Sequence, residues 1–258
     1  EQINLSNYGI EETTIVAINN DTNEEYTYSD LQNTKMKLSF KEDGKDIIFY
    51  GEINENNYWD GDCAINIYND GVLELITEAL YDDGEMLSYR QVLISNHAVE
   101  GKAWTISNRV KEDQGNKGIS EQYIYKEVER TEEIILATGF AEMQELDIRI
   151  GYYNGMTSNG MYNDTTGNAV LIKFDENGYV RTLYKGNVQN GEFNDKTGNA
   201  WQIVKTDVAE YIYYNGDFIN GERVGSVSQD DIVDIEFIKR TLEDNEILIE
   251  LNWENNSL

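Results

Sequence analysis

The chain has 258 residues, of which 20 are basic and 49 acidic, so its formal net charge is −29. This charge argues against nucleic acid or an anionic membrane surface as a partner, since both require cationic contacts. Solubility is the first explanation of the charge, and the alternative is a basic partner protein or divalent cations. No stretch approaches ~20 consecutive apolar residues, so we expect no transmembrane segment.

Residues 1–35 are predicted to form an N-terminal cap that contains one strand candidate, Thr13–Asn19. The sequence begins with Glu1 and Gln2 rather than methionine, which is consistent with a removed signal peptide. Ile, Asn, Glu and Lys are abundant and Pro is absent, a bias typical of some bacterial proteins. These features slightly favour the bacterial cell surface or secretion over the cytoplasm.

Residues 36–225 are predicted to form degenerate repeats. The clearest pair is YNGMTSNGMYNDTTGN at residues 153–168 and YKGNVQNGEFNDKTGN at residues 184–199, at an offset of 31 residues. Looser copies upstream share a Gly-x-Ala step followed by apolar residues at alternate positions. We align Ala64 with this step, with one extra residue after Gly61, and interpret Lys111–Ser120 as an inserted loop.

Each repeat is predicted to be a β-hairpin. Apolar residues alternate with polar ones in Ile65–Ile67 and Trp104–Ile106, which is the period of a strand with one buried face. Asn-Gly and Asp-Gly pairs tolerate the positive φ angles of tight hairpin turns. Such turn signals occur at Asn69-Asp70-Gly71, Asp83-Gly84, Asn177-Gly178, Asn190-Gly191 and Asn220-Gly221.

Residues 226–258 are predicted to form a C-terminal cap. Ser228 and Asp231 favour a helix start, and the apolar spacing from Ile232 to Leu242 predicts a short capping helix within 228–247. Glu246–Trp253 (EILIELNW) has the alternation of a final strand. The predicted fold class is therefore all-β, an elongated single-layer antiparallel sheet of about six consecutive β-hairpin repeats with a short C-terminal capping helix.

The pattern Tyr214-x-Gly-x-Phe-x-Asn-Gly, followed by Gly225, resembles the MORN repeat. Residues 64–89 are similar to the degenerate bacterial variant of that repeat, and the likeness covers roughly residues 36–225. Two departures are the longer repeats here and the Ala that replaces the second glycine of each Gly-x-Gly. The resemblance implies a non-catalytic module for protein–protein interaction or scaffolding, in which the Tyr and Gly positions are structural.

Candidate chemical groups are few. The acidic pairs Asp60/Asp62 and Asp82/Asp83 are interpreted as solvated turn residues. The turns at residues 58–62 and 163–168 could offer oxygen ligands to calcium, although the twelve-residue calcium-loop pattern is absent. Cys63 is expected to be a small buried residue. One cysteine and one histidine cannot form an ordinary zinc site. We therefore expect a protein that is not an enzyme, with no catalytic residue, cofactor or metal.

Aromatic residues are the remaining candidates for binding. They recur in the best repeats, and on a sheet adjacent residues point to opposite faces, so some of the rings should be exposed. The candidates are Tyr152, Tyr162, Phe193, Trp201 and Tyr213. A row of rings would suit a peptide, or alternatively a cell-wall glycan, which would make the protein a bacterial cell-surface carbohydrate-binding module.

Overall fold

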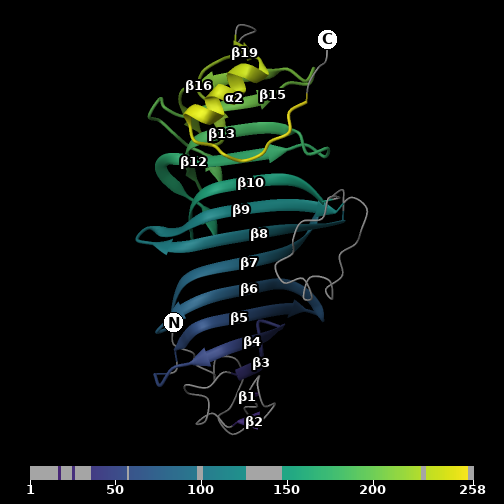
Figure 1. Cartoon of the computed structure of the whole chain (residues 1–258), viewed down its shortest axis with the longest axis vertical. Helices are drawn as coiled ribbons and strands as arrows, with labels where there is room; N and C mark the ends of the chain where they lie inside the picture. The colour runs from purple at the N-terminus through teal and green to yellow at the C-terminus, as the bar shows by residue number, and fades with distance from the viewer. Residues whose placement is uncertain are drawn as a thin grey trace. The chain divides into compact units, whose positions relative to one another are not determined.

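The computed structural model describes residues 17–18, 25–26, 36–56, 58–97, 101–125, 147–227 and 231–254. These residues form mostly antiparallel β-structure (Figure 1). They divide into two compact units, with the boundary after Lys111. Consecutive strands pair as hairpins in each unit, and among the described residues one short helix follows near the C-terminus. The predicted all-β class and the consecutive hairpins are confirmed.

The first unit is a sheet whose strands from Met36 onward pair in chain order, and whose first strand pairs with both the second and the third. Its strands are β1 (Ala17–Ile18), β2 (Glu25–Tyr26), β3 (Met36–Glu42), β4 (Lys45–Ile53), β5 (Trp59–Asn69), β6 (Val72–Asp82), β7 (Glu85–His97) and β8 (Gly101–Glu112). Most of the predicted N-terminal cap lies outside the described residues. Within it, Ala17 pairs with both Tyr26 and Leu38, so a short strand does occur inside the candidate Thr13–Asn19.

The second unit repeats the hairpin pattern. Its strands are β9 (Gly115–Tyr125), β10 (Asp147–Ser158), β11 (Met161–Tyr162), β12 (Asp164–Phe174), β13 (Val180–Gln189), β14 (Glu192–Phe193), β15 (Trp201–Lys205), β16 (Tyr211–Asn215), β17 (Phe218–Ile219), β18 (Glu222–Arg223) and β19 (Ile232–Val233). Residues 115–120, expected in an inserted loop, belong instead to β9, where Ser120 pairs with Tyr153.

The turns form where the sequence signals placed them. Asn190 and Gly191 have φ angles of 52° and 82°, and Asp70 and Gly71 have angles of 50° and 78°. Positive φ at both central residues is the geometry that matches a hairpin turn to the twist of its strands. The local chemistry of Asn, Asp and Gly therefore fixes where each strand ends.

Helix α2 (Ile235–Asp244) confirms the predicted short C-terminal helix, with a later start. The side chain of Asp234 caps it by accepting a hydrogen bond from the amide of Phe237. Ile232, expected on the helix, belongs to β19 because it pairs with Ile212 of β16. The described residues contain no helix with the length and apolar character needed to cross a membrane.

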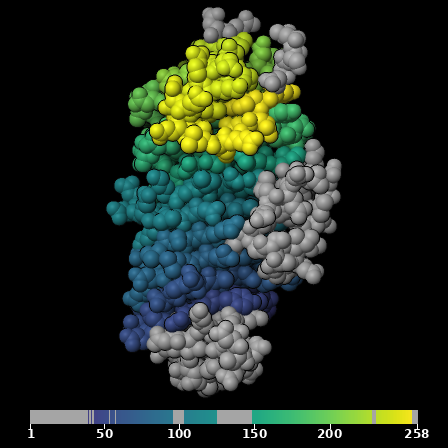
Figure 2. Space-filling view, in the orientation of Figure 1, coloured from purple at the N-terminus to yellow at the C-terminus, as the bar shows by residue number. Residues whose placement is uncertain are grey.

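The segment after α2 is extended but is not the predicted final strand. Between residues 247 and 254 it makes one isolated parallel bridge, from Asn252 to Tyr179. Figure 1 shows this segment and α2, both in yellow, in front of strands of the second unit, and Figure 2 shows their atoms covering part of those strands. We call residues 247–254 the C-terminal strap.

Candidate interaction surface

The sheet of the second unit has two apolar faces. On β12, Val170 and Ile172 point to one face, whereas Ala169 and Leu171 point to the other. We call the first the covered face, because α2 and the strap pack on it, and the second the ring face. The covered face contains Val170, Ile172, Phe174, Val180, Leu183, Trp201, Ile203 and Tyr211. The ring face contains Tyr153, Ala169, Leu171, Tyr184, Val188, Phe193, Ala200 and Phe218.

The ring face explains the recurring Tyr-x-Gly pattern. The hydroxyl of Tyr184 donates a 2.6 Å hydrogen bond to the carbonyl of Asn187, so the ring folds over Gly186. A Cβ atom at Gly186 would lie 2.5 Å from that hydroxyl, which only glycine avoids. Tyr153 makes the same bond to Met156, at 2.7 Å. These Tyr and Gly residues are needed for the fold of each repeat.

A buried aspartate closes the turn of each of the two best repeats. Asp195, 1% exposed, accepts hydrogen bonds from the Asn187 amide (2.8 Å) and from the amide and hydroxyl of Thr197 (2.8 and 2.6 Å). Burial acts to raise its pKa, but these hydrogen bonds outweigh it and the pKa of Asp195 is lowered. Asp164 makes the equivalent contacts with Met156 and Thr166. The carboxylate oxygens of this turn are thus engaged by the chain itself.

The first unit contains a copy of the ring-over-glycine arrangement, and this copy shows that the alignment of Ala64 is wrong. Phe49 stacks on Trp59 with centroids 4.8 Å apart, as Tyr184 stacks on Phe193 at 4.1 Å. A Cβ atom at Gly51 would lie 2.7 Å from Cys63 Sγ, just as one at Gly186 would lie 2.6 Å from Ala200 Cβ. Cys63 therefore occupies the Ala200 position, and no residue is inserted after Gly61. The sequence comparison missed this because it matched alanine with alanine.

Cys63 is buried, as expected, with 4% of its surface exposed. Burial raises the pKa of its thiol to about 11, and the nearby carboxylates of Asp62 and Asp60 act in the same direction. Among the described residues, no group of three or more His, Cys, Asp and Glu side chains is placed to hold a metal ion.

The five aromatic candidates do not form one row. Tyr152, Trp201 and Tyr213 lie on the covered face, where α2 and the strap pack. Tyr162 and Phe193 lie on the ring face, stacked on Tyr153 and Tyr184 with centroids 3.8 and 4.1 Å apart. Their binding role stays a prediction, and the structure divides them between two surfaces.

Helix α2 covers one part of the covered face. Ile238 is fully buried against the sheet, and the ring of Phe237 meets that of Tyr213 edge to face at 5.1 Å. At the end of the helix, Asn245 Oδ1 accepts hydrogen bonds from Lys185 Nζ (3.1 Å) and Trp201 Nε1 (3.3 Å). The last turn of the helix is therefore tied to two neighbouring strands.

The strap covers another part of this face through alternate side chains. Ile247, Ile249, Leu251 and Trp253 pack against the buried cluster, whereas Leu248 is 92% exposed. The amide of Val180 donates a 2.9 Å hydrogen bond to the carbonyl of Asn252. The strap thus resembles an extended peptide bound across a sheet, with every second side chain turned toward the surface below.

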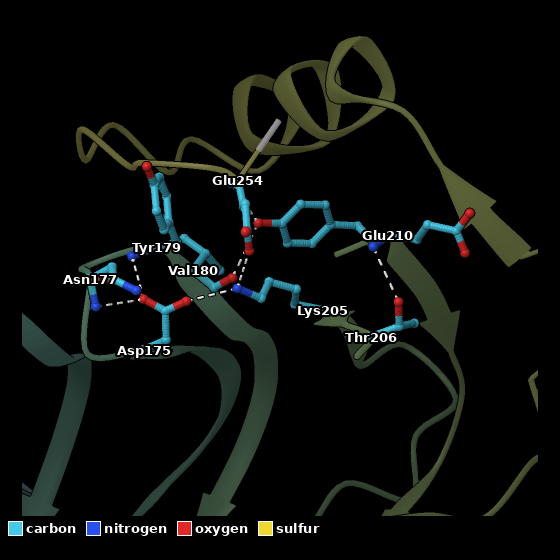
Figure 3. Close-up of polar contacts among 9 residues, drawn as sticks. Asp175, Asn177, Tyr179, Val180, Lys205, Thr206, Glu210 and Glu254 are labelled. Atoms are coloured by element: carbon cyan, nitrogen blue, oxygen red, sulfur yellow. Dashed lines mark hydrogen bonds and ion pairs between the residues drawn. The ribbon is translucent and has the colours of Figure 1, made fainter. Parts of the chain in front are cut away.

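A charged cluster holds the end of the strap (Figure 3). Lys205, whose side chain is 16% exposed, forms ion pairs with Asp175, at 2.7 Å, and with Glu254 of the strap. Burial acts to lower the pKa of Lys205, but hydrogen bonds to the two carboxylates outweigh it and the pKa is raised. Burial likewise acts to raise the pKa of Asp175, yet the hydrogen bond from Lys205 and those from two backbone amides lower it. Both ionised forms are stabilised by the arrangement.

Tyr211 links the same end of the strap to the sheet. Its hydroxyl donates to the carbonyl of Val180 (3.3 Å) and accepts from the amide of Glu254 (3.0 Å). Its ring meets that of Trp253 edge to face, with centroids 5.1 Å apart. Lys205 Nζ also lies 5.8 Å from the ring centroid of Tyr179. This end of the strap is therefore held by one aromatic residue and one cation of the sheet.

Arg149 provides a second cation along the strap. Its Nη1 donates a hydrogen bond of 3.4 Å to the carbonyl of Glu250, and its guanidinium lies 5.7 Å from the ring centroid of Phe174 and 6.0 Å from that of Tyr123. Its Nε is buried and has no hydrogen-bond partner in the described part of the chain. Sequence reasoning missed Arg149 and Lys205 because nothing in their local sequence marks contacts with residues far along the chain.

No family model matches the chain, and neither does any curated protein or solved structure. The covered face is an apolar sheet surface, flanked by two cations, that carries an extended peptide segment of the same chain.

Proposed function

We propose that this protein is a non-catalytic, MORN-like repeat module that mediates protein–protein interaction or scaffolding. The observation that carries the proposal is the strap, a peptide segment docked on the covered face through alternate apolar side chains and an ion pair with Lys205. In peptide recognition by extended segments, pockets for alternate side chains give specificity, and here the alternate apolar side chains of the strap make the main contacts.

The different roles of shared and variable residues within each repeat support the proposal. Tyr184, Gly186 and Asp195 are engaged in intrachain contacts that shape the hairpin. Residues that differ between repeats are then left to carry recognition, as in repeat proteins whose shared positions are structural. The net charge of −29 adds long-range attraction to a basic protein partner.

Affinity capture tests this function. The purified full chain, immobilised, is exposed to cytosolic and envelope fractions of its source organism, and any retained protein is purified and titrated back by calorimetry. We expect a saturable protein partner whose association rate falls with added salt, since charge steering is screened. Retention by wall polysaccharide alone would reject this function and support the glycan-binding alternative.

A further inference from the structure

We propose that the covered face, from Arg149 to Lys205, is a binding site for an extended segment of a partner protein. That segment would carry apolar side chains at alternate positions followed by a carboxylate, and the C-terminal strap would occupy the site until the partner displaces it. The inference deepens the proposed function and rests on it, because it names the surface and the chemistry of the partner.

The strap is attached mainly through side chains and not through a strand ladder. The sheet below it is complete without it: β12 pairs with β13, β13 with β15, and β15 with β16. With the backbone of the described sheet residues, by contrast, the strap makes one isolated bridge, at Tyr179, which includes the bond from the Val180 amide. Its other backbone bonds join Ile247 to the carbonyl of Leu242, and Glu250 and Glu254 to the side chains of Arg149 and Tyr211. Opening of the strap therefore breaks few backbone hydrogen bonds and leaves the sheet paired, which is the pattern of a segment that opens locally.

The two cations define what a displacing segment must offer. Lys205 binds the carboxylate of Glu254, and Arg149 binds the carbonyl of Glu250. The buried Nε of Arg149 is a donor that the strap leaves unsatisfied, so a better ligand could satisfy it. In a chain with 49 acidic residues, Lys205 selects a carboxylate locally, while basic residues elsewhere on the partner would meet the acidic surface.

The apolar contacts define the rest of the motif. Ile247, Ile249, Leu251 and Trp253 pack on the cluster that includes Ile172, Leu183 and Ile203. A partner segment with the same spacing would bury the same surface. Because the strap is tethered, it competes at an effective concentration on the order of millimolar, so a partner must bind more strongly than the strap sequence alone.

A peptide experiment on the full chain tests the site. A fluorescently labelled peptide of residues 247–254 (ILIELNWE) is titrated into the wild type, into Ile249→Asp, which weakens the strap, and into Leu248→Asp. Leu248→Asp is the matched control, because it places the same charge at the adjacent, 92% exposed position. We expect at least tenfold tighter binding of the peptide to Ile249→Asp than to the other two proteins. A peptide that itself carries Ile249→Asp should not bind.

A second pair of variants keeps the test decisive. Ile249→Ala weakens the strap without adding a charge, and adding Lys205→Met to Ile249→Asp should reduce peptide affinity at least fivefold by removing the cation that receives the carboxylate. If folded Ile249→Asp and Ile249→Ala bind the peptide no better than the wild type, the proposal is wrong. Loss of the β-sheet circular dichroism spectrum in both would also overturn it, because the strap would then be part of the fold. Peptide binding needs no cellular partner, so this failure is distinct from a failed capture experiment.

Discussion

The amide of Val180 donates a 2.9 Å hydrogen bond to the carbonyl of Asn252, which joins the start of β13 to the C-terminal strap. Around this contact, Tyr211 and Lys205 bind the backbone and side chain of Glu254. The strap is therefore fixed at its end by a small number of polar contacts. The contact of Lys205 is made by a side chain that lies outside the apolar cluster of the sheet.

The first prediction concerns the ion pairs. Lys205→Met should lower the free energy of unfolding by about 1–2 kcal/mol, since it leaves the partly buried Asp175 without its cation. The matched control is Lys239→Met, which removes an exposed ion pair to Glu236 on α2 and should change stability by less than about 0.5 kcal/mol. Urea denaturation followed by circular dichroism measures both. Equal losses in the two variants would show that Lys205 has no special role.

The second prediction concerns acid. The pKa of Asp175 is lowered in the folded protein, so its contribution to stability is complete above the ordinary aspartate value and is lost as the pH falls through the lowered value. Lys205 and the amides of Asn177 and Tyr179 donate hydrogen bonds to this carboxylate. Lys205 in turn contacts the carboxylate of Glu254 and lies 5.8 Å from the ring centroid of Tyr179. Asp175→Asn should therefore flatten the pH dependence of unfolding below about pH 4.

Exposed Asp207 supplies the control for that experiment. Asp207→Asn should leave the pH dependence of the wild type in place, because this side chain lies at the surface. The free energy of unfolding is measured between pH 2 and pH 7 for all three proteins. A wild-type curve that Asp175→Asn does not alter would contradict the role assigned to the Lys205 cluster.

The third prediction concerns the Tyr-x-Gly geometry. Gly186→Ala places a methyl group 2.5 Å from the Tyr184 hydroxyl and 2.6 Å from Ala200 Cβ, so it should destabilise the protein by about 1–3 kcal/mol. Gly151→Ala is the control, since its methyl group would meet Gln122 Cβ at 3.4 Å. Thermal unfolding compares the two. If Gly186→Ala were as stable as Gly151→Ala, the glycine would not be needed for the fold of the repeat.

The fourth prediction concerns Cys63. Burial raises the pKa of its thiol to about 11, from an ordinary value of 9.0, which lowers the thiolate fraction at pH 8 by about a hundredfold. We expect slow reaction with iodoacetamide in the folded protein and rapid reaction in urea, measured by mass spectrometry. Rapid modification of the folded protein would mean that Cys63 does not fill the space beside Gly51.

The parts of the fold that could be predicted are those set by local chemistry. Asn190-Gly191 and Asp70-Gly71 mark their turns because positive φ depends on the residue itself and not on distant contacts. The hairpins follow from these turns and from the alternation of apolar residues between them. The alignment of Ala64 with the alanine of the repeat is one position out of register, because a repeat can replace alanine with another small residue, here Cys63, and still fill the same space.

The candidate site depended on contacts between distant residues and could not be predicted. Alternation in EILIELNW indicates a strand. In the structure the alternate side chains of the strap face the sheet surface below, while its backbone makes only one isolated bridge to the described strands. Tyr152 and Tyr162 both belong to aromatic positions of the repeat, yet they lie on opposite faces. Which face becomes covered is decided by α2 and the strap, and the repeats alone do not specify it.

Native-state hydrogen exchange of the unmodified full chain tests the central claim most directly. If the strap occupies a binding site and opens without unfolding the sheet, the amide of Val180 and those of the strap should exchange much faster than amides of β12, β13 and β15 that bond within the sheet. The exchange of the Val180 amide and of the strap amides should slow little under conditions that stabilise the sheet. Equal protection of the strap and of these strands, lost together in one global transition, would contradict the claim and show the strap to be a permanent part of the fold.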